Sequence, residues 1–414
     1  MTGTRRTDAV VIGGGQAGLA MSRCLTDCSV DHVVVERGRV AERWRSERWE
    51  SLRLLTPNWQ SRLPGWHYRG DDPDGYFTMP ELIDHLAAYA RSFAAPVHEG
   101  TTVLSVRAHR DGYRVLTDRG IWTTPNVVVA TGACDQPRVP AVAAHVPARV
   151  TQITPNRYRR PGALPPGGVL VVGASATGIQ LASELRQAGR DVVLATGRHT
   201  RVPRRYRGLD IQWWLDRMGV YDEGIDTVRD PERARREPSL QLTGDPHGRT
   251  LDLARLAGMG VRLAGRLERI VGHRVEFADD LPATCAAADA RLTRLLDRVD
   301  EHAAGTGLDA EVEPPCRPAP FAPRGLTSLD LGRTGVTNVV WATGYRRSYP
   351  WLHVPVLDAA GEIRHRGGIT PAPGLAVLGL PFMRHRNSTF LDGVGRDAAA
   401  LADHVTSSRE RACA

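Results

Sequence analysis

The chain has 414 residues, of which 42% are hydrophobic and 24% charged, enough for two or three domains with sizeable cores. These values exclude a small disulfide-stapled scaffold and a mainly disordered protein. No apolar run approaches the roughly 18 uncharged residues that a membrane-spanning helix needs. The first strand-like segment begins at Asp8, which leaves no room for a signal peptide, so we expect a cytoplasmic protein without a membrane span.

The formal net charge is +8, and all 54 basic residues are arginines because the chain contains no lysine. Lysine Schiff-base chemistry and a P-loop are therefore excluded. Nucleic-acid binding is an alternative function for a basic chain, but the arginines are spread beside 46 acidic residues, so we expect no nucleic-acid partner. No C-x-x-C pattern occurs, and no metal site is predicted. No pattern sets an oligomeric state.

The opening of the chain predicts a β-α-β unit with a dinucleotide site. An apolar strand at 8–12 leads into Gly13, Gly15 and Gly18, which match G-x-G-x-x-G, and the next strand ends at Glu36. The first glycine makes the tight turn, the second lets a pyrophosphate approach, and the third lets the helix pack closely on the strand. The helix N-terminus attracts the anion, and the acidic residue accepts hydrogen bonds from a ribose.

The rest of the chain repeats this organisation. The expected elements are strands at 102–108, 113–117 and 121–122 with a turn at Asp111-Gly112, a strand at 126–130 before Thr131-Gly132, a strand at 169–172, a glycine turn at 173–178 with a helix to 188, a strand at 191–195, a helix at 284–306, a strand at 339–341 before Ala342-Thr-Gly-Tyr345, and a helix at 395–404. Pro-rich stretches at 160–168 and 314–323 separate domains. We predict an α/β fold of two doubly wound, Rossmann-like dinucleotide-binding domains, with residues 156–335 inserted between 1–155 and 336–414.

The second glycine turn has Gly173 and Gly178 at its ends but Ser175 at the middle position. A serine still permits a nearby phosphate and adds a hydroxyl donor. The same strand-turn-helix context is typical of a hydrolase nucleophile elbow, with His385 or His404 as a late triad partner. That alternative lacks the final glycine of the elbow and leaves the first turn unexplained.

Arginines replace the acidic residue after the next strand of this second unit. Arg198 and Arg201 stand there, followed by Arg204 and Arg205. Arginine accommodates a ribose 2′-phosphate, whereas a carboxylate repels it, so the second site is predicted to bind NADPH. The alternative is that these arginines belong to the general arginine excess. An acid-terminated and an arginine-terminated site in one chain indicate hydride transfer from NADPH to a flavin held at the first site.

The set of motifs resembles the flavin-containing monooxygenase group, with its N-hydroxylase, Baeyer-Villiger and YUCCA-like relatives. The resemblance rests on the two turns, on residues 342–345 with Pro350 beyond them, and on residues 388–397. It implies that FAD occupies the first domain (1–155 and 336–414) and NADPH the inserted domain (156–335). It also implies that NADPH and O2 are consumed through a flavin C4a-hydroperoxide that oxygenates a nitrogen, sulfur or carbonyl centre of a small molecule.

The resemblance assigns cofactor-binding residues by position. The residues expected at FAD are Gly13, Gly15, Gly18, Glu36, Arg37 and Trp44, those expected at NADPH are Gly173, Ser175, Thr177, Gly178, Arg198 and Arg201, and further cofactor-binding residues are Gln16, Ala17, Thr131, Gly132, Ala176, Gly344 and Gly393.

Catalytic candidates come from the family fingerprint F-x-G-x-x-x-H-x-x-x-Y, which aligns here on Tyr158. Its phenylalanine, glycine and histidine positions hold Ala148, Val150 and Thr154. The active-site asparagine of many members corresponds to Asn58. The catalytic candidates are therefore Asn58, Thr154 and Tyr158. The leading function is an NADPH-dependent FAD monooxygenase, and the altered fingerprint keeps open an NADPH oxidoreductase or dehydrogenase that inserts no oxygen.

Overall fold

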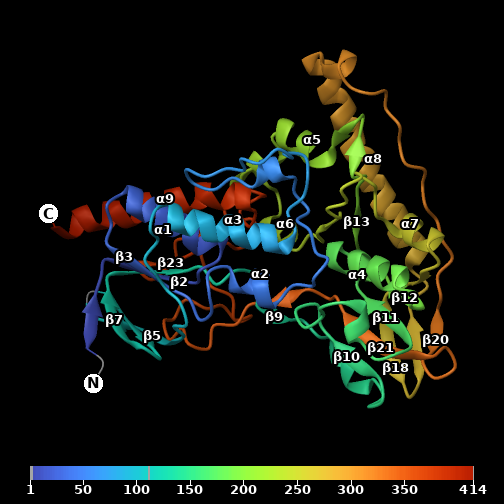
Figure 1. Ribbon diagram of the computed structural model, residues 1–414, viewed down its shortest axis with the longest axis horizontal. Helices are drawn as coiled ribbons and strands as arrows, with labels where there is room; N and C mark the ends of the chain where they lie inside the picture. Colours follow the sequence, from blue (N-terminus) through green and yellow to red (C-terminus); the bar gives the residue numbers. More distant parts are fainter. Residues whose placement is uncertain (1–2, 111, 414) are drawn as a thin grey trace.

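The computed structural model describes residues 3–110 and 112–413 and consists of two α/β units that lie side by side (Figure 1). The expected turn residue Asp111 lies outside the described residues. Both units are built on a five-stranded parallel sheet, so the predicted α/β class with two Rossmann-like sheets is confirmed. Within the described ranges, no helix is both long and apolar enough to cross a membrane.

The first sheet has the order β23-β8-β2-β3-β4. Its central strands are Val-rich and buried along their whole length, which suits a parallel sheet covered on both faces. Helices cover one face, and a second sheet, β1-β7-β6-β5, lies on the other side (Figure 1). The elements of this unit are β1 (Thr4–Arg6), β2 (Ala9–Ile12), α1 (Gln16–Asp27), β3 (His32–Val35), α2 (Glu42–Ser46), η1 (Asn58–Gln60), α3 (Met79–Ser92), β4 (Val97–His98), β5 (Val103–His109), β6 (Gly112–Thr117), β7 (Gly120–Thr124), β8 (Asn126–Val129), β23 (Leu375–Val377) and α9 (Leu391–Cys413).

The second sheet has the order β10-β21-β11-β12-β17, with helix α4 after β11 as in the first unit. The long helix α8 projects beside α5 at the upper right of Figure 1. The remaining elements are β9 (Gln136–Pro137), η2 (Ala141–His145), β10 (Thr151–Ile153), η3 (Pro161–Ala163), β11 (Gly168–Val172), α4 (Ala176–Gln187), β12 (Val192–Ala195), β13 (Thr200–Arg201), β14 (Arg205–Tyr206), β15 (Leu209–Asp210), α5 (Ile211–Arg217), η4 (Val220–Asp222), η5 (Ile225–Thr227), α6 (Pro231–Arg235), β16 (Leu240–Gln241), α7 (Leu253–Gly258), β17 (Arg262–Ala264), β18 (Leu267–Val271), β19 (Arg274–Phe277), α8 (Leu281–Thr306), η6 (Leu308–Ala310), β20 (Ser328–Asp330), β21 (Val336–Trp341) and β22 (Tyr345–Arg346).

Two boundary strands lie in a different sheet from the one expected. The predicted limits put β10 and β21 with the first domain, but β21 pairs in parallel with both β10 and β11 of the second sheet. The repeated A-T-G sequence therefore does not mark a return to the first unit. It marks the same place in both units, because each copy of the sequence follows the strand that pairs with the glycine-turn strand. In the first unit this is β8, which pairs with β2, and in the second it is β21, which pairs with β11.

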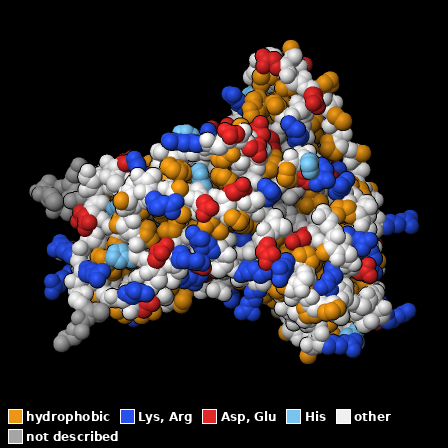
Figure 2. All heavy atoms as spheres, in the orientation of Figure 1, with side chains coloured by type: hydrophobic (Ala, Val, Ile, Leu, Met, Phe, Trp, Pro, Cys, Tyr) orange, Lys and Arg blue, Asp and Glu red, His pale blue; other side chains and the backbone are white. Residues whose placement is uncertain are grey.

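The two units share a hydrophobic core. One continuous cluster of buried side chains contains Val11 of the first sheet together with Val171 of the second sheet and Tyr158 of the connecting segment. Figure 2 shows arginine and acidic side chains interspersed over the visible face. No stripe of one sign crosses that face, which agrees with the expectation that the arginines are spread.

Candidate functional site

The first glycine turn has the geometry that a dinucleotide needs. Gly13 has φ +115°, which favours glycine, and a Cβ there would press against the Ala130 carbonyl. A Cβ on Gly18 would collide with the Gly13 carbonyl, so this glycine allows α1 to approach β2. At Gly15, by contrast, a Cβ would meet nothing within 4 Å. The middle glycine is therefore not required by the protein's own packing, and the open space above it suits a ligand.

Among the described residues, no side chain caps the N-terminus of α1. Gly15 is its N-cap, and its first turn carries no acidic residue. The unpaired N–H groups and the helix dipole attract an anion at such an end. These groups open into a cavity of about 670 Å³, a volume typical of cofactor sites.

Most residues expected at FAD line this cavity, and others that sequence reasoning missed complete it. The expected residues on the wall are Gly13, Gly15, Gln16, Ala17, Glu36, Arg37, Trp44, Thr131 and Gly132. Gly18 lies behind the turn, and Gly393 lies in the first turn of α9, where a Cβ would collide with the Asn387 carbonyl. The missed residues include Arg43, Glu47, Ala133–Gln136, Ser348, Pro350, Trp351, Gly379, Thr389 and Val394.

Glu36 is held in place at the end of β3. Its Oε2 accepts the N–H of Gly14 (2.6 Å) and its Oε1 accepts the N–H of Gly38 (2.8 Å). Both bonds fix the carboxylate at the cavity wall, where a ribose hydroxyl can donate to its remaining lone pairs. The contact of Glu36 with a ribose stays a prediction.

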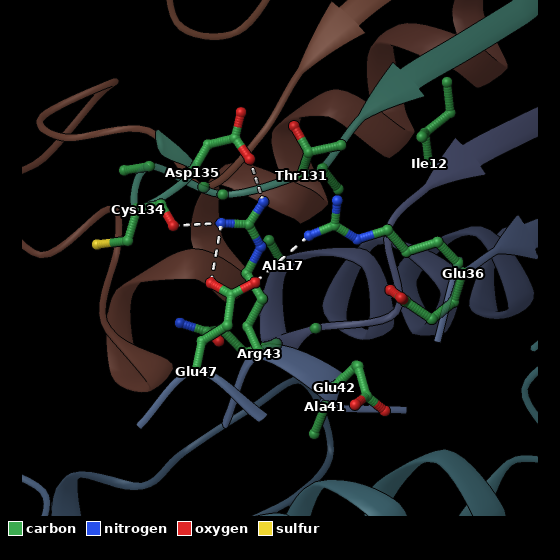
Figure 3. A pocket seen from close by; sticks show the side chains of 18 of the residues that line it. Ile12, Ala17, Glu36, Ala41, Glu42, Arg43, Glu47, Thr131, Cys134 and Asp135 are labelled. Atoms are coloured by element: carbon green, nitrogen blue, oxygen red, sulfur yellow. Dashed lines mark hydrogen bonds and ion pairs between the residues drawn. The ribbon is translucent and has the colours of Figure 1, made fainter. Parts of the chain in front are cut away.

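Polar side chains on opposite walls bind one another across the cavity. Figure 3 shows the Arg43 guanidinium between the Cys134 carbonyl, Asp135 (2.5 Å) and Glu47 (3.7 Å). The indole N–H of Trp44 donates to Gln16 Oε1 (3.1 Å), whose amide donates to the Thr389 carbonyl (3.3 Å). These contacts tie α2 to α1, to the segment after β8 and to the segment before α9.

The second glycine turn repeats the first. Gly173 has φ +106° and lies against the Ala342 carbonyl, and a Cβ on Gly178 would collide with the Gly173 carbonyl. The middle residue Ser175 has φ −77° and ψ −173°, close to the −85° and −172° of Gly15. Any L-residue adopts these angles, which explains why a serine is tolerated. Ser175 makes no capping hydrogen bond, so α4 also presents an uncapped N-terminus.

The neighbours of this turn are those predicted. Ala176 and Thr177 form the first turn of α4, and Gly344 follows β21 directly beside the glycine turn. Because β21 belongs to the second sheet, Gly344 lies at the second site, as Gly132 lies at the first.

The arginines after β12 have three different environments. Arg201 is buried and pairs with Asp252 (2.9 Å) and Asp289 (2.6 Å), so its charge is already neutralised inside the protein. Arg204 is 1% exposed and pairs with Asp210. Arg198 is exposed and donates only to a backbone carbonyl, that of Arg236 (3.1 Å). Of the two arginines predicted at the 2′-phosphate, Arg198 therefore has the environment of an anion-binding residue and Arg201 does not.

A second arginine near Arg198 was not predicted. Arg291 of α8 donates to the His199 carbonyl (2.5 Å). Burial, followed by the positive charges of Arg198 and Arg294, lowers the pKa of Arg291. Guanidinium groups that destabilise one another in this way favour a bound anion. No sequence signal pointed to Arg291, because α8 lies about 90 residues further along the chain.

None of the catalytic candidates belongs to the cavity wall. Tyr158 is 1% exposed, and its hydroxyl donates to Glu184 (3.2 Å) of α4. The Thr154 hydroxyl donates to Asn156 (2.7 Å) within its own turn. Burial raises the pKa of Tyr158, as expected for a phenol that packs between the units. Tyr158 and Thr154 thus hold the connecting segment, which argues against direct catalytic contacts.

Asn58 is buried in η1, three residues after the cavity residue Leu55. Its amide donates to the Asp72 carbonyl (2.9 Å), but its Oδ1 has no partner. The side-chain nitrogen and oxygen of Gln60 and the Ser61 hydroxyl also lack hydrogen-bond partners. Asn58, Gln60 and Ser61 are all buried. An unmade hydrogen bond on a buried polar group costs about 1–3 kcal/mol, so such a group of unpartnered atoms indicates a missing polar ligand or ordered water.

Comparisons with known proteins show the family of the chain. The family model described as pyridine nucleotide-disulphide oxidoreductase matches residues 10–215. An uncharacterized CzcO-like oxidoreductase of Geobacillus kaustophilus is 31% identical over 401 residues, covering 96% of this chain and 98% of the relative. The indole-3-pyruvate monooxygenase YUCCA6 of Arabidopsis thaliana is 30% identical over 313 residues, covering 67% of this chain and 74% of the relative. The chain belongs to the flavin-containing monooxygenase-like family. It is an FAD-dependent oxidoreductase, as the sequence predicted.

Solved structures share the fold of this flavin-containing monooxygenase-like chain. A flavin-containing monooxygenase from Stenotrophomonas maltophilia has a TM-score of 0.68 at 18% identity and covers 99% of this chain and 100% of its own. A structure described as an OTEMO complex with FAD and NADP has a TM-score of 0.56 at 16% identity, covering 98% and 85%. That complex holds both cofactors that the sequence predicts for the present chain.

Proposed function

We propose that this chain is an NADPH-consuming FAD monooxygenase that transfers one oxygen atom of O2 to a small organic molecule. The observation that carries the proposal is the pair of matched glycine turns, one opening onto the 670 Å³ cavity and the other followed by an exposed arginine. The YUCCA6 relative, named as a monooxygenase, supports oxygen insertion. The oxygen-activation route that the resemblance implies stays a prediction.

The residues at the first turn fit FAD. The α1 N-terminus and the open space at Gly15 would hold the pyrophosphate, and Glu36 would accept from the adenosine ribose. Arg37 and Trp44 are proposed to line the bound cofactor, as the cavity wall includes both. When bound, FAD supplies the electron acceptor for hydride from NADPH and the centre at which O2 is activated. The protein's part is to bind, orient and exclude water.

The second turn fits NADPH. Its pyrophosphate would lie over the uncapped N-terminus of α4 at Ser175 and Thr177. Arg198 would bind the 2′-phosphate, with Arg291 as the neighbouring positive charge. Arg201 is committed to Asp252 and Asp289, so we propose a structural role for it.

The segment Asn58–Ser61 is proposed as the polar side of the substrate site. It follows Leu55 of the cavity wall and carries buried polar atoms without partners. Donors and acceptors that the protein leaves unpaired select a substrate that can pair with them. Of the substrate classes that the resemblance implies, carbonyl compounds and amines meet this requirement better than thioethers, whose sulfur is only a weak acceptor.

A second candidate function keeps both cofactors but inserts no oxygen. The observation that favours it is the placement of Thr154 and Tyr158 away from the cavity wall, with Tyr158 bound to Glu184. An enzyme that lacks the phenylalanine, glycine and histidine of the family fingerprint would return electrons to O2 as hydrogen peroxide.

Oxygen-18 labelling separates the two functions. The purified flavin-bound protein is supplied with NADPH and ¹⁸O2 together with a tertiary amine, a thioether or a 2-oxo acid, and product mass and peroxide are measured. We expect one labelled oxygen in the product of at least one class and less peroxide than NADPH consumed. Peroxide equal to the NADPH consumed with all three classes, and no labelled product, would establish the oxidase function instead.

A further inference from the structure

A buried polar cluster lies at the start of α9, outside the site described above. It consists of Asp397 on α9 and of Arg384, His385 and Ser388 on the segment before that helix. The Nδ1 of His385 is 3.9 Å and the Nε of Arg384 4.0 Å from Asp397 Oδ1. The Ser388 hydroxyl donates to the His385 carbonyl (2.8 Å) and accepts backbone N–H groups, and it lies close enough to Asp397 to lower the pKa of that carboxyl.

The polar side-chain atoms that face one another in this cluster are buried and make no hydrogen bonds to the described residues. The Asp397 side chain is 0% exposed, yet neither of its oxygens has a hydrogen-bond partner. His385 Nδ1 and Arg384 Nε are also buried and unpartnered. A buried carboxylate without hydrogen bonds is costly, so the group holds a proton or is bridged by water across the gaps to its neighbours.

One member of the cluster is partly exposed, and two of its members are close in the sequence to residues of the cavity wall. The His385 side chain is 29% exposed, whereas its Nδ1 faces the interior beside Asp397. On the inner side, Ser388 is next to the cavity residue Thr389, and Asp397 lies one helical turn after the cavity residue Val394.

Charged groups from every neighbouring element act on this pair. Burial raises the pKa of Asp397 to about 6, opposed by the Ser388 hydroxyl and the guanidinium groups of Arg384 and Arg396. Burial, then Arg396 and Arg384, lower the pKa of His385, while Asp222 of η4 opposes them. Burial thus favours the neutral form of both groups, the protonated carboxyl of Asp397 and the unprotonated imidazole of His385, so that one group can give up a proton that the other can take.

We propose that His385 and Asp397 form a proton-exchange pair that carries the proton consumed in each turnover from solvent to the wall of the flavin cavity. The role rests on the proposed function, in which substrate + O2 + NADPH + H⁺ gives oxygenated substrate + H2O + NADP⁺. The oxidase alternative, O2 + NADPH + H⁺ giving H2O2 + NADP⁺, consumes one proton as well. The pair is thus needed under either outcome of the labelling experiment.

Infrared spectroscopy of the flavin-bound protein tests the pair without turnover. Wild type, Asp397→Asn and the control Asp403→Asn, an exposed position on the same helix, are compared between pH 5 and pH 8. In wild type and in the control we expect a protonated-carboxyl band that disappears as the pH rises through about 6. This band should be absent from Asp397→Asn at every pH. If Asp397→Asn shows the same pH-dependent band as wild type, or if wild type shows no such band, the assignment is wrong.

The pH dependence of flavin reoxidation by O2 tests the proton's route. Asp397→Asn and His385→Gln should each slow reoxidation about tenfold at pH 8 and flatten its pH profile, with flavin content and melting temperature unchanged. Asp403→Asn should keep the wild-type profile. If either substitution at the pair leaves the profile unchanged in a folded, flavin-bound protein, the proposed route is wrong, whichever product the enzyme makes.

Discussion

At the scale of single residues, two glycines of the first turn are required by the fold, whereas the third is required only by the proposed ligand. Gly13 and Gly18 are fixed by the chain itself, through a positive φ in one case and a helix-strand contact in the other. Gly15 has ordinary dihedral angles and open space around its Cβ position. The second turn makes the same distinction, because a serine occupies the position that corresponds to Gly15.

The turn predicts opposite outcomes for two alanine substitutions. Gly15→Ala should fold with a melting temperature near wild type but lose FAD, because the methyl group occupies the space proposed for the pyrophosphate. Gly18→Ala should destabilise the protein by about 1–3 kcal/mol, because its methyl group forces α1 away from β2. Flavin absorbance per mole of protein measures the FAD content of each variant. Thermal unfolding of the two variants without FAD measures their stability. A Gly15→Ala protein that retains FAD as well as wild type would contradict the assigned pyrophosphate position.

At the scale of elements, the segment after β12 shows that one sequence pattern can hold residues of different roles. Arg198, Arg201 and Arg204 are equivalent in the sequence, but only Arg198 is exposed. Which arginine meets Asp252, Asp289 or Asp210 depends on the packing of α7, α8 and β15. Charge alone could not assign these roles.

Cofactor kinetics test the role of Arg198. Arg198→Ala should raise KM for NADPH at least tenfold and leave KM for NADH nearly unchanged, because a phosphate-guanidinium pair is lost only with NADPH. Arg205→Ala is the matched control, since it removes the same charge from an exposed position in the same segment. Equal changes in the two KM values for Arg198→Ala would remove this residue from the 2′-phosphate site.

Much of the element pattern could be predicted from the sequence. The strands at both glycine turns, the helices after them and the long helix α8 have strong local periodicity or turn signals. The sheet that β10 and β21 join could not be predicted, because the buried, Val-rich β21 fits either sheet equally well and the three-residue β10 carries no signal of its own. Cavity residues such as Glu47 and Gly379 were missed because they come from segments without a motif. Thr389 was missed although it lies in the motif at 388–397, because the motif does not show which of its residues face the cavity.

At the scale of the whole molecule, the second unit holds part of the first unit's cavity wall. Arg204 donates to the Leu55 carbonyl (2.7 Å), and the Tyr76 hydroxyl donates to Asp210 (2.6 Å). Arg159 donates to the Arg48 carbonyl (3.0 Å) across the same boundary. Leu55 and Arg48 both line the cavity. The two units are thus joined by buried polar contacts as well as by a shared core, which positions the two proposed dinucleotide sites relative to each other.

The central claim is that the chain transfers hydride from NADPH at the second site to FAD at the first. It is tested most directly by titrating the purified, flavin-bound protein with NADPH without oxygen and recording the visible absorbance of the flavin. We expect the oxidised flavin band to disappear at one equivalent of NADPH and to need a large excess of NADH. A flavin that stays oxidised in excess NADPH would contradict the account.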